Sequence, residues 1–98
     1  MWYVILGTDA PDSLPRRQAL RPAHLERVGL LRDAGRVRLA GPMPAIDSPD
    51  PGPAGFVGSL IVAEFESLIA AREWALADPY LTGGAWRDVA VHPLNIVF

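Results

Sequence analysis

Two short stretches of this chain hold the residues whose types suit acid–base chemistry. The first, Arg21-Pro22-Ala23-His24-Leu25, contains one of only two histidines in 98 residues. The second, Asp78-Pro79-Tyr80, supplies a carboxylate. A neutral imidazole that a carboxylate holds in one orientation can accept a proton, which is the task of a general base. His24 and Asp78 are therefore the predicted catalytic pair, provided that the fold brings them together.

Three further side chains are candidates for positioning a substrate. Arg21 could hold an anionic group, and Ser59 and Tyr80 could each offer a hydroxyl. Each also has an ordinary explanation: a solvated arginine, a residue at the start of a strand, and a packed tyrosine whose hydroxyl reaches water. No His, Asp or Glu residues recur at metal-ligand spacing, so we expect neither a metal nor another cofactor.

The helix that carries His24 is predicted to run from Pro22 to about Ala34, because proline suits the first position of a helix. Ser13 is expected to cap a separate helical turn before it. His24 then lies in the first turn, on the same face as Val28 and Leu31, near the positive end of the helix dipole. That position favours neutral imidazole. The alternative is a core histidine that a backbone carbonyl satisfies, and the residues alone slightly favour this alternative.

Asp78 ends the second predicted helix, which covers about Leu68 to Ala77 behind an N-cap at Ser67. It shares a face with two small residues, Ala71 and Ala75. Taken alone, Asp78 is better explained as the N-cap of a turn that follows it. The start of one helix and the end of the other lie at opposite ends of the sheet, so spacing alone does not bring the pair together.

The remaining elements complete a β-α-β-β-α-β order. The predicted strands are Trp2–Leu6, Arg36–Ala40, Ser59–Phe65 and Trp86–Val91, and a proline-rich connection from Gly41 to Gly58 joins the second and third. The first strand reads as buried on both faces. With right-handed crossovers this order gives an α+β, ferredoxin-like fold, in which two helices cover one face of a four-stranded antiparallel sheet.

The other face of such a sheet would be apolar and uncovered. Covering it with a second copy is the simplest remedy, so we expect a homodimer. The apolar tail from Leu94 to Phe98 is expected to dock on another surface, for which that partner is one candidate.

Composition narrows the classes of function. The 98 residues are predicted to form one domain, residues 1–98. A net charge of -2 provides no field that would attract nucleic acid or an anionic membrane. The absence of cysteine excludes disulfides, thiolate metal sites and cysteine nucleophiles. No apolar run has the length of a membrane span or the flanks of a signal peptide, so we expect a cytoplasmic protein.

Six short segments, spread in order over nearly the whole chain, form a recognisable set: Arg21-Pro22-x-His24-Leu25, Gly35-Arg36, Ala40-Gly41-Pro42, Gly55-Phe56-x-Gly58-Ser59, Ala63-Glu64-Phe65 and Asp78-Pro79-Tyr80. This set resembles the YciI family of small bacterial proteins. The resemblance implies a fold of the dimeric α+β barrel type, in which two copies associate through their sheets. It also implies a His/Asp-centred site, which maps onto His24 and Asp78 with Ser59 beside them. His92 stands where relatives tend to have lysine, and it receives no role.

The family also suggests a class of reaction, because a few relatives are linked to elimination on small ring compounds and similar barrels include lactone isomerases. We therefore predict a cofactor-independent enzyme in which His24 abstracts a proton, Asp78 orients it, and Ser59, Arg21 or Tyr80 positions a small organic substrate. The reaction would be elimination, isomerisation or hydrolysis. The alternative is a non-catalytic dimer that binds a small molecule or has an accessory role. An open pocket before His24, with one ring nitrogen unpaired, would favour the enzyme.

Overall fold

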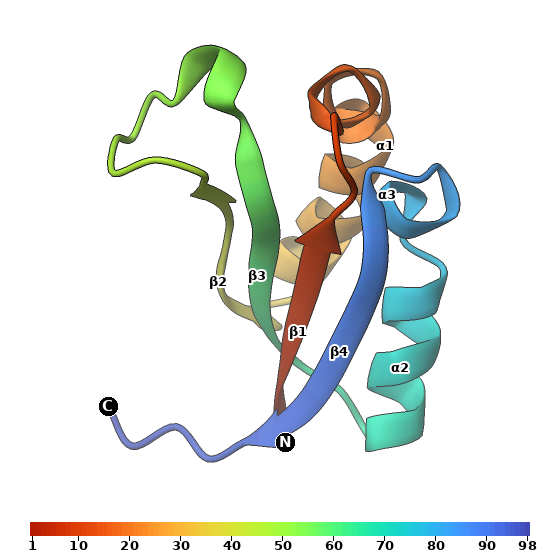
Figure 1. Ribbon diagram of the computed structural model, residues 1–98. Coiled ribbons are helices and arrows are strands. Elements are labelled where there is room, and N and C mark those ends of the chain that lie inside the picture. Colours follow the sequence, from red (N-terminus) through yellow and green to blue (C-terminus); the bar gives the residue numbers. More distant parts are fainter.

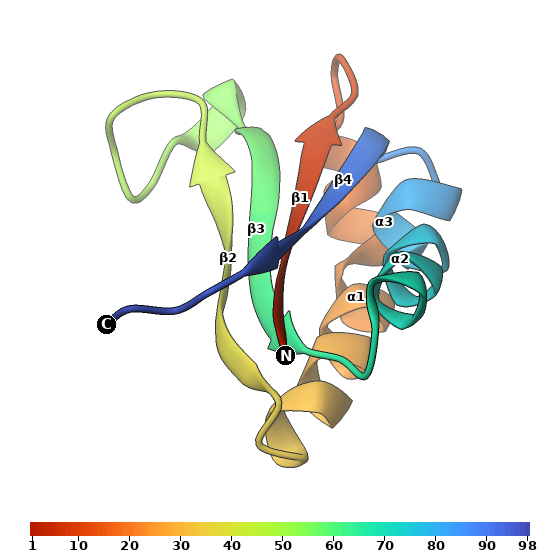
Figure 2. The same cartoon turned by 90° about the horizontal axis from the view of Figure 1, so that it is seen from below.

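The computed structural model describes residues 1–98 as a four-stranded antiparallel sheet with its helices on one face (Figure 1, Figure 2). The elements are β1 (Trp2–Asp9), α1 (Leu14–Asp33), β2 (Val37–Pro44), the 3-10 turn η1 (Gly52–Ala54), β3 (Phe56–Glu64), α2 (Leu68–Leu76), α3 (Pro79–Thr82) and β4 (Trp86–Leu94). The strand order is β2-β3-β1-β4, and all three neighbouring pairs are antiparallel. The predicted ferredoxin-like arrangement is confirmed.

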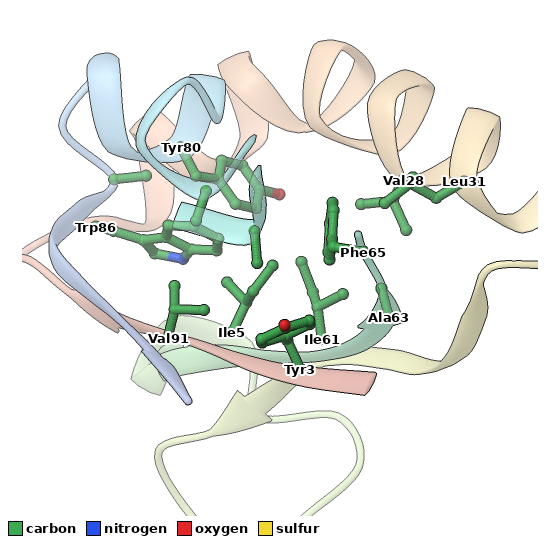
Figure 3. Packing of buried hydrophobic residues seen from close by; sticks show 13 residues of the cluster. Tyr3, Ile5, Val28, Leu31, Ile61, Ala63, Phe65, Tyr80, Trp86 and Val91 are labelled. Atoms are coloured by element: carbon green, nitrogen blue, oxygen red, sulfur yellow. The ribbon is translucent and has the colours of Figure 1, made fainter. Parts of the chain in front are cut away.

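The core lies between the sheet and the helices (Figure 3). Ile5 of β1 and Ile61 of β3 are paired in register near its centre, and both are almost completely buried. Successive side chains of a strand point to opposite faces. Tyr3 and Ile5 therefore face the core, whereas Val4 and Leu6 face the other side and are only half-buried.

The first helix differs from its prediction. It is one continuous helix, Leu14–Asp33, with Pro22 in its interior rather than at its start. Pro22 lacks the N–H that would bond the carbonyl of Gln18, four residues earlier. Both residues are exposed, so water can satisfy that carbonyl and the helix continues. Ser13 precedes the helix without capping it, because its hydroxyl donates to Asp9 at 2.5 Å. None of the helices is both long and apolar enough to cross a membrane.

Prolines lie inside both edge strands and explain two further corrections. β2 continues to Pro44 and β3 begins at Phe56, so the connection predicted from Gly41 to Gly58 covers only residues 45–55 and contains η1. β4 runs through Pro93 rather than ending there. An edge strand tolerates proline because its missing N–H can face away from the sheet.

The sheet face opposite the helices is apolar and uncovered in the single chain. Val4 pairs with Val62 and Leu6 pairs with Leu60 across β1 and β3, on the side away from the helices. The prediction that the first strand is buried on both faces is therefore wrong for one chain alone. The segment after β4 extends away from the helices and leaves Phe98 fully exposed (Figure 1, Figure 2).

Gly7 of β1 provides a test of the core packing. A Cβ atom at this position would lie 2.3 Å from Cε2 of Trp86, whose buried ring has no room to move aside. We expect Gly7→Ala to lower the free energy of unfolding by about 1–3 kcal/mol, the typical cost of overpacking. Gly41→Ala is the matched control in a strand, because its Cβ would meet nothing within 4 Å. Urea denaturation compares the two variants, and equal midpoints would contradict this packing.

Candidate functional site

His24 of α1 and Asp78 after α2 are in direct contact. Nδ1 of His24 lies 2.9 Å from both carboxylate oxygens of Asp78. The histidine is 7% exposed, and Asp78 is completely buried. A carboxylate only accepts hydrogen bonds, so Nδ1 carries a proton, and in the neutral form of the ring the lone pair lies on Nε2.

Asp78 has two further partners. Its Oδ1 accepts the backbone N–H of Tyr80 at 2.9 Å, which is the N-cap contact of α3, and Arg27 Nη1 lies 3.6 Å from Oδ2. Arg27 is itself held in place, since Nη2 donates to the carbonyl of Trp74 and the guanidinium lies 4.3 Å from the centre of that residue's ring. Its charge balances that of the buried carboxylate. Asp78 is thus a helix cap as well as a partner of His24, although the sequence presents these roles as alternatives.

The positions of the helices explain the contact. Because α1 starts earlier than predicted, His24 lies near the middle of the helix and not in its first turn. The expected influence of the helix dipole on the imidazole therefore does not apply. α2 begins after its predicted N-cap, Ser67, and its fully buried Ala71 and Ala75 allow close packing. Asp78 continues the same buried face and so reaches the middle of α1.

Aromatic rings fix the plane of the imidazole. The ring of Tyr80 stacks on His24 with 4.1 Å between centroids and 15° between planes. The ring of Trp86 meets His24 edge-on at 5.7 Å and 78°. Trp86 also packs edge-on against Tyr80 (Figure 3). These contacts leave the histidine one orientation, with Nδ1 towards Asp78.

The imidazole of His24 also borders a cavity of about 390 Å³. Nε2 has no hydrogen-bond partner in the chain, and it is not one of the unpaired atoms that the protein fully encloses. A molecule in the cavity can therefore reach it. Arg21, Ser59 and Tyr80 line the same cavity, together with apolar residues such as Ile61.

The three predicted substrate-positioning residues differ in their surroundings. Arg21 is exposed, whereas Ser59 and Tyr80 are 3% exposed. The hydroxyl oxygen of Ser59 accepts a hydrogen bond from Arg17 at 2.8 Å. The structure thus brings all three to one cavity with His24, and it adds Arg17 to the group.

Arg17 is a functional candidate that the sequence analysis missed. Its guanidinium makes a bidentate contact with Asp9 at 2.6 and 2.7 Å and donates to the carbonyl of Gly58. Arg17 precedes His24 by seven residues, a spacing that places both side chains on one helical face. Because the helix was predicted to start at Pro22, Arg17 lay outside it, and the seven-residue spacing to His24 was not recognised.

The remaining acidic and histidine side chains form no second cluster. No group of three His, Asp or Glu side chains is arranged to hold a metal ion. His92, on β4, is exposed.

The hydroxyl of Tyr80 stays protonated at neutral pH. Burial raises its pKa above the ordinary value of 10.0, although the nearby charges of Arg17 and Arg21 act in the opposite direction. Tyr80 can therefore donate a hydrogen bond in the cavity.

The whole chain is similar to known proteins. Residues 1–95 match the family described as the YCII-related domain. The chain is 57% identical to Protein YciI of Escherichia coli O6:H1 and 47% identical to an uncharacterized protein of Haemophilus influenzae, in each case over 98 residues and all of both chains. A solved structure of 5-chloro-2-hydroxyhydroquinone dehydrochlorinase from Burkholderia phenoliruptrix, in complex with 2,5-dihydroxybenzoquinone, has a TM-score of 0.84 and 23% identity, covering 97% of this chain and 94% of that one. At this identity the likeness shows the fold alone.

Tyr80→Phe tests the environment of the phenol. Because the folded state raises the pKa of Tyr80, its contribution to stability is complete below pH 10.0 and is lost as the pH rises through the raised value. We expect the wild-type protein to lose stability above pH 10 more steeply than Tyr80→Phe, which has no group to ionise there. Urea midpoints on both sides of pH 10 measure the difference. Parallel pH profiles would show that the phenol is not held neutral by the fold.

Proposed function

The chain belongs to the family of YCII-related domains, and from this premise and the geometry of its site we propose that it is a small-molecule enzyme with His24 as its general base. The observation that carries the proposal is the unpaired Nε2 of His24. It borders a cavity of about 390 Å³, while the buried carboxylate of Asp78 holds Nδ1. A ring that served only the core would have both nitrogens paired and no cavity in front of it.

In the proposed mechanism, Nε2 of His24 removes a proton from the substrate. The electron pair left behind forms a new double bond as a leaving group departs, or shifts along the substrate in an isomerisation. In hydrolysis the proton would come from an attacking water. Asp78 keeps the ring oriented and stabilises the imidazolium that forms. General bases of this kind contribute a rate enhancement of about 10²–10⁴-fold.

The class of substrate is proposed from the cavity lining. Ser59, Arg21 and Tyr80 provide hydrogen-bond donors, and the apolar lining suits the carbon skeleton of a small organic molecule. The neighbour of known structure is a dehydrochlorinase, and dehydrochlorination is an elimination. Elimination is therefore the first reaction class to examine in this chain, followed by isomerisation and hydrolysis.

The same cavity also fits a second function, in which the protein binds a small molecule without transforming it. In that case the polar pair His24 and Asp78 would fix the geometry of the ligand or of the core. If the protein is an enzyme, replacing His24 abolishes turnover. If it only binds its ligand, there is no turnover to lose and the stoichiometric binding is unchanged.

We also propose that the protein is a homodimer in which two sheets pack against each other. The partly exposed apolar residues of the open sheet face, among them Val4, Leu6 and Leu60, would be removed from water in this arrangement. The family resemblance supports this arrangement, since it implies a fold of the dimeric α+β barrel type, in which two copies associate through their sheets. The exposed C-terminal residue Phe98 would also find cover against a partner.

Replacement of His24 tests the enzyme proposal. Metabolites that raise the melting temperature of the wild-type protein would be assayed for turnover by mass spectrometry. We expect His24→Asn to lower kcat at least about 100-fold, because the base is absent while the new amide can still donate to Asp78. His92→Ala is the control, since it removes the other, exposed histidine. Turnover that survives in His24→Asn would exclude this mechanism.

Leu60→Asp tests the dimer. A carboxylate in the middle of the open sheet face would lose its hydration without gaining a partner, so we expect this variant to be a monomer. Ile69→Asp is the matched control, because Ile69 is 68% exposed on α2 on the helical side of the sheet. Analytical ultracentrifugation should give the mass of two chains for the wild type and the control. A wild-type mass of one chain would contradict the proposal.

A further inference from the structure

A second charged group borders the cavity. Arg17 lies on α1 two helical turns before His24, about 10 Å along the helix axis, on the same face. Only 5% of the residue is exposed, yet it forms part of the cavity lining. Removing a guanidinium from water costs free energy, so a buried one needs partners. The hydrogen bonds of Arg17 therefore indicate its role.

Four hydrogen bonds hold this guanidinium, and they use only two of its three nitrogens. Nε donates to Asp9 at 2.6 Å. The two N–H groups of Nη2, one of them shared between two acceptors, donate to Asp9 at 2.7 Å, to the carbonyl of Gly58 at 2.9 Å and to Ser59 at 2.8 Å. Asp9 is itself fixed by the hydroxyl of Ser13. The arginine is therefore rigidly placed before any ligand arrives.

The third nitrogen, Nη1, makes none of these hydrogen bonds, although a hydrogen bond between this arginine and the hydroxyl of Tyr80 helps to lower the pKa of that tyrosine against the larger effect of burial. The unpaired side-chain nitrogens that the protein fully encloses are those of Arg27 and Trp86, so Nη1 of Arg17 retains accessible surface. The rings of Phe56 and Tyr80 each have their centres 5.0 Å from the guanidinium carbon of Arg17. Nη1 is thus the part of the guanidinium that remains available to a ligand.

The charges around the cavity favour an anion. Arg17 and Arg21 both line it, whereas no aspartate or glutamate does. The two nearby carboxylates, Asp9 and Asp78, are turned to their own partners behind the cavity wall. A cationic N–H donor in surroundings poor in water binds an anionic oxygen more strongly than a neutral one.

We propose that Nη1 of Arg17 binds an anionic oxygen of the substrate, either a carboxylate oxygen or a phenolate or enolate oxygen. The carbon skeleton then lies against the apolar lining, with the reacting atom facing His24. The preference of the cavity for an anion depends on Arg17 alone. The claim that this anion is the substrate rests on the proposed function. Arg17 is a specificity-determining residue, and it would also stabilise negative charge that develops on this oxygen as His24 removes a proton.

The test uses two pairs of probes that differ in charge but little in shape. Benzoate is compared with benzamide for a carboxylate, and 4-nitrophenolate with 4-nitroanisole for a phenolate. Calorimetric titrations at fixed ionic strength and mildly alkaline pH give the affinities. We expect the wild-type protein to bind at least one anion about tenfold more tightly than its neutral counterpart, and the arm in which this occurs identifies the type of oxygen.

Two variants attribute this preference to Arg17. Arg17→Lys keeps a cation for Asp9 but has no second nitrogen to offer the cavity, and the double variant Asp9→Asn with Arg17→Gln removes both charges of the buried pair. Both should lose the preference for the anion while retaining the circular dichroism of a folded protein. Arg87→Gln is the control, because it removes an exposed arginine of β4, 3.7 Å from Asp88, and should keep the preference.

His24→Asn separates this inference from the proposed function. It should retain the preference for the anion and lose turnover. Equal affinities for the charged and neutral probes, no binding of either anion, or an unchanged preference in folded Arg17→Lys would overturn the role of Arg17 and leave the role of His24 standing. If His24→Asn kept both the preference for the anion and full turnover, the role of His24 would be overturned and the role of Arg17 would stand.

Discussion

The buried carboxylate of Asp78 is the interaction on which the arrangement of the site depends. An enclosed charge needs partners, and removing one member of a buried pair typically costs about 3–5 kcal/mol. The partners of Asp78 come from two elements: the imidazole of His24 and the guanidinium of Arg27 belong to α1, and the N–H of Tyr80 begins α3. α1 therefore cannot slide or turn against the end of α2 without leaving the carboxylate unpaired. The orientation of the imidazole is fixed by folding, before any ligand binds.

A second buried pair, Arg17 and Asp9, fixes the other end of the cavity in the same way. In both pairs the carboxylate lies behind the wall, and the side chain from α1 faces the cavity. The cavity is consequently lined by hydrogen-bond donors and by one basic nitrogen, although the chain as a whole carries a net charge of -2. The ring of Tyr80 lies against both side chains from α1, 4.1 Å from the ring of His24 and 5.0 Å from the guanidinium of Arg17. One small molecule can therefore contact the base and the cation together.

The periodicity of the sequence predicted the order of the elements, the buried face of His24 and the caps at Ser67 and Asp78, because these features depend on residues close in the chain. It placed the start of the first helix wrongly, because Pro22 suits a first helical turn as well as an exposed position in an interior turn. That error left Arg17 outside the helix predicted to carry His24, so the helical face that the two residues share was not recognised. The contact between His24 and Asp78 depends on how far α1 extends and where α2 ends, which are tertiary facts that local patterns do not contain. The family resemblance provided this contact where spacing could not.

The continuity of α1 is what joins the two halves of the site. Arg17 and His24 keep a fixed separation because the helix runs without a break between them and lacks only the hydrogen bond at Pro22, whereas a helix broken at Pro22 would let each side chain move with its own segment. Proline inside a helix costs about 3 kcal/mol when the lost hydrogen bond is buried and the ring crowds its neighbours. Here Pro22 and Gln18 are both exposed, so water can reach the carbonyl that lacks its partner. The exposed position of Pro22 lowers that cost, and it leaves the buried side of α1 as one rigid surface that presents a cation and a base at a constant distance.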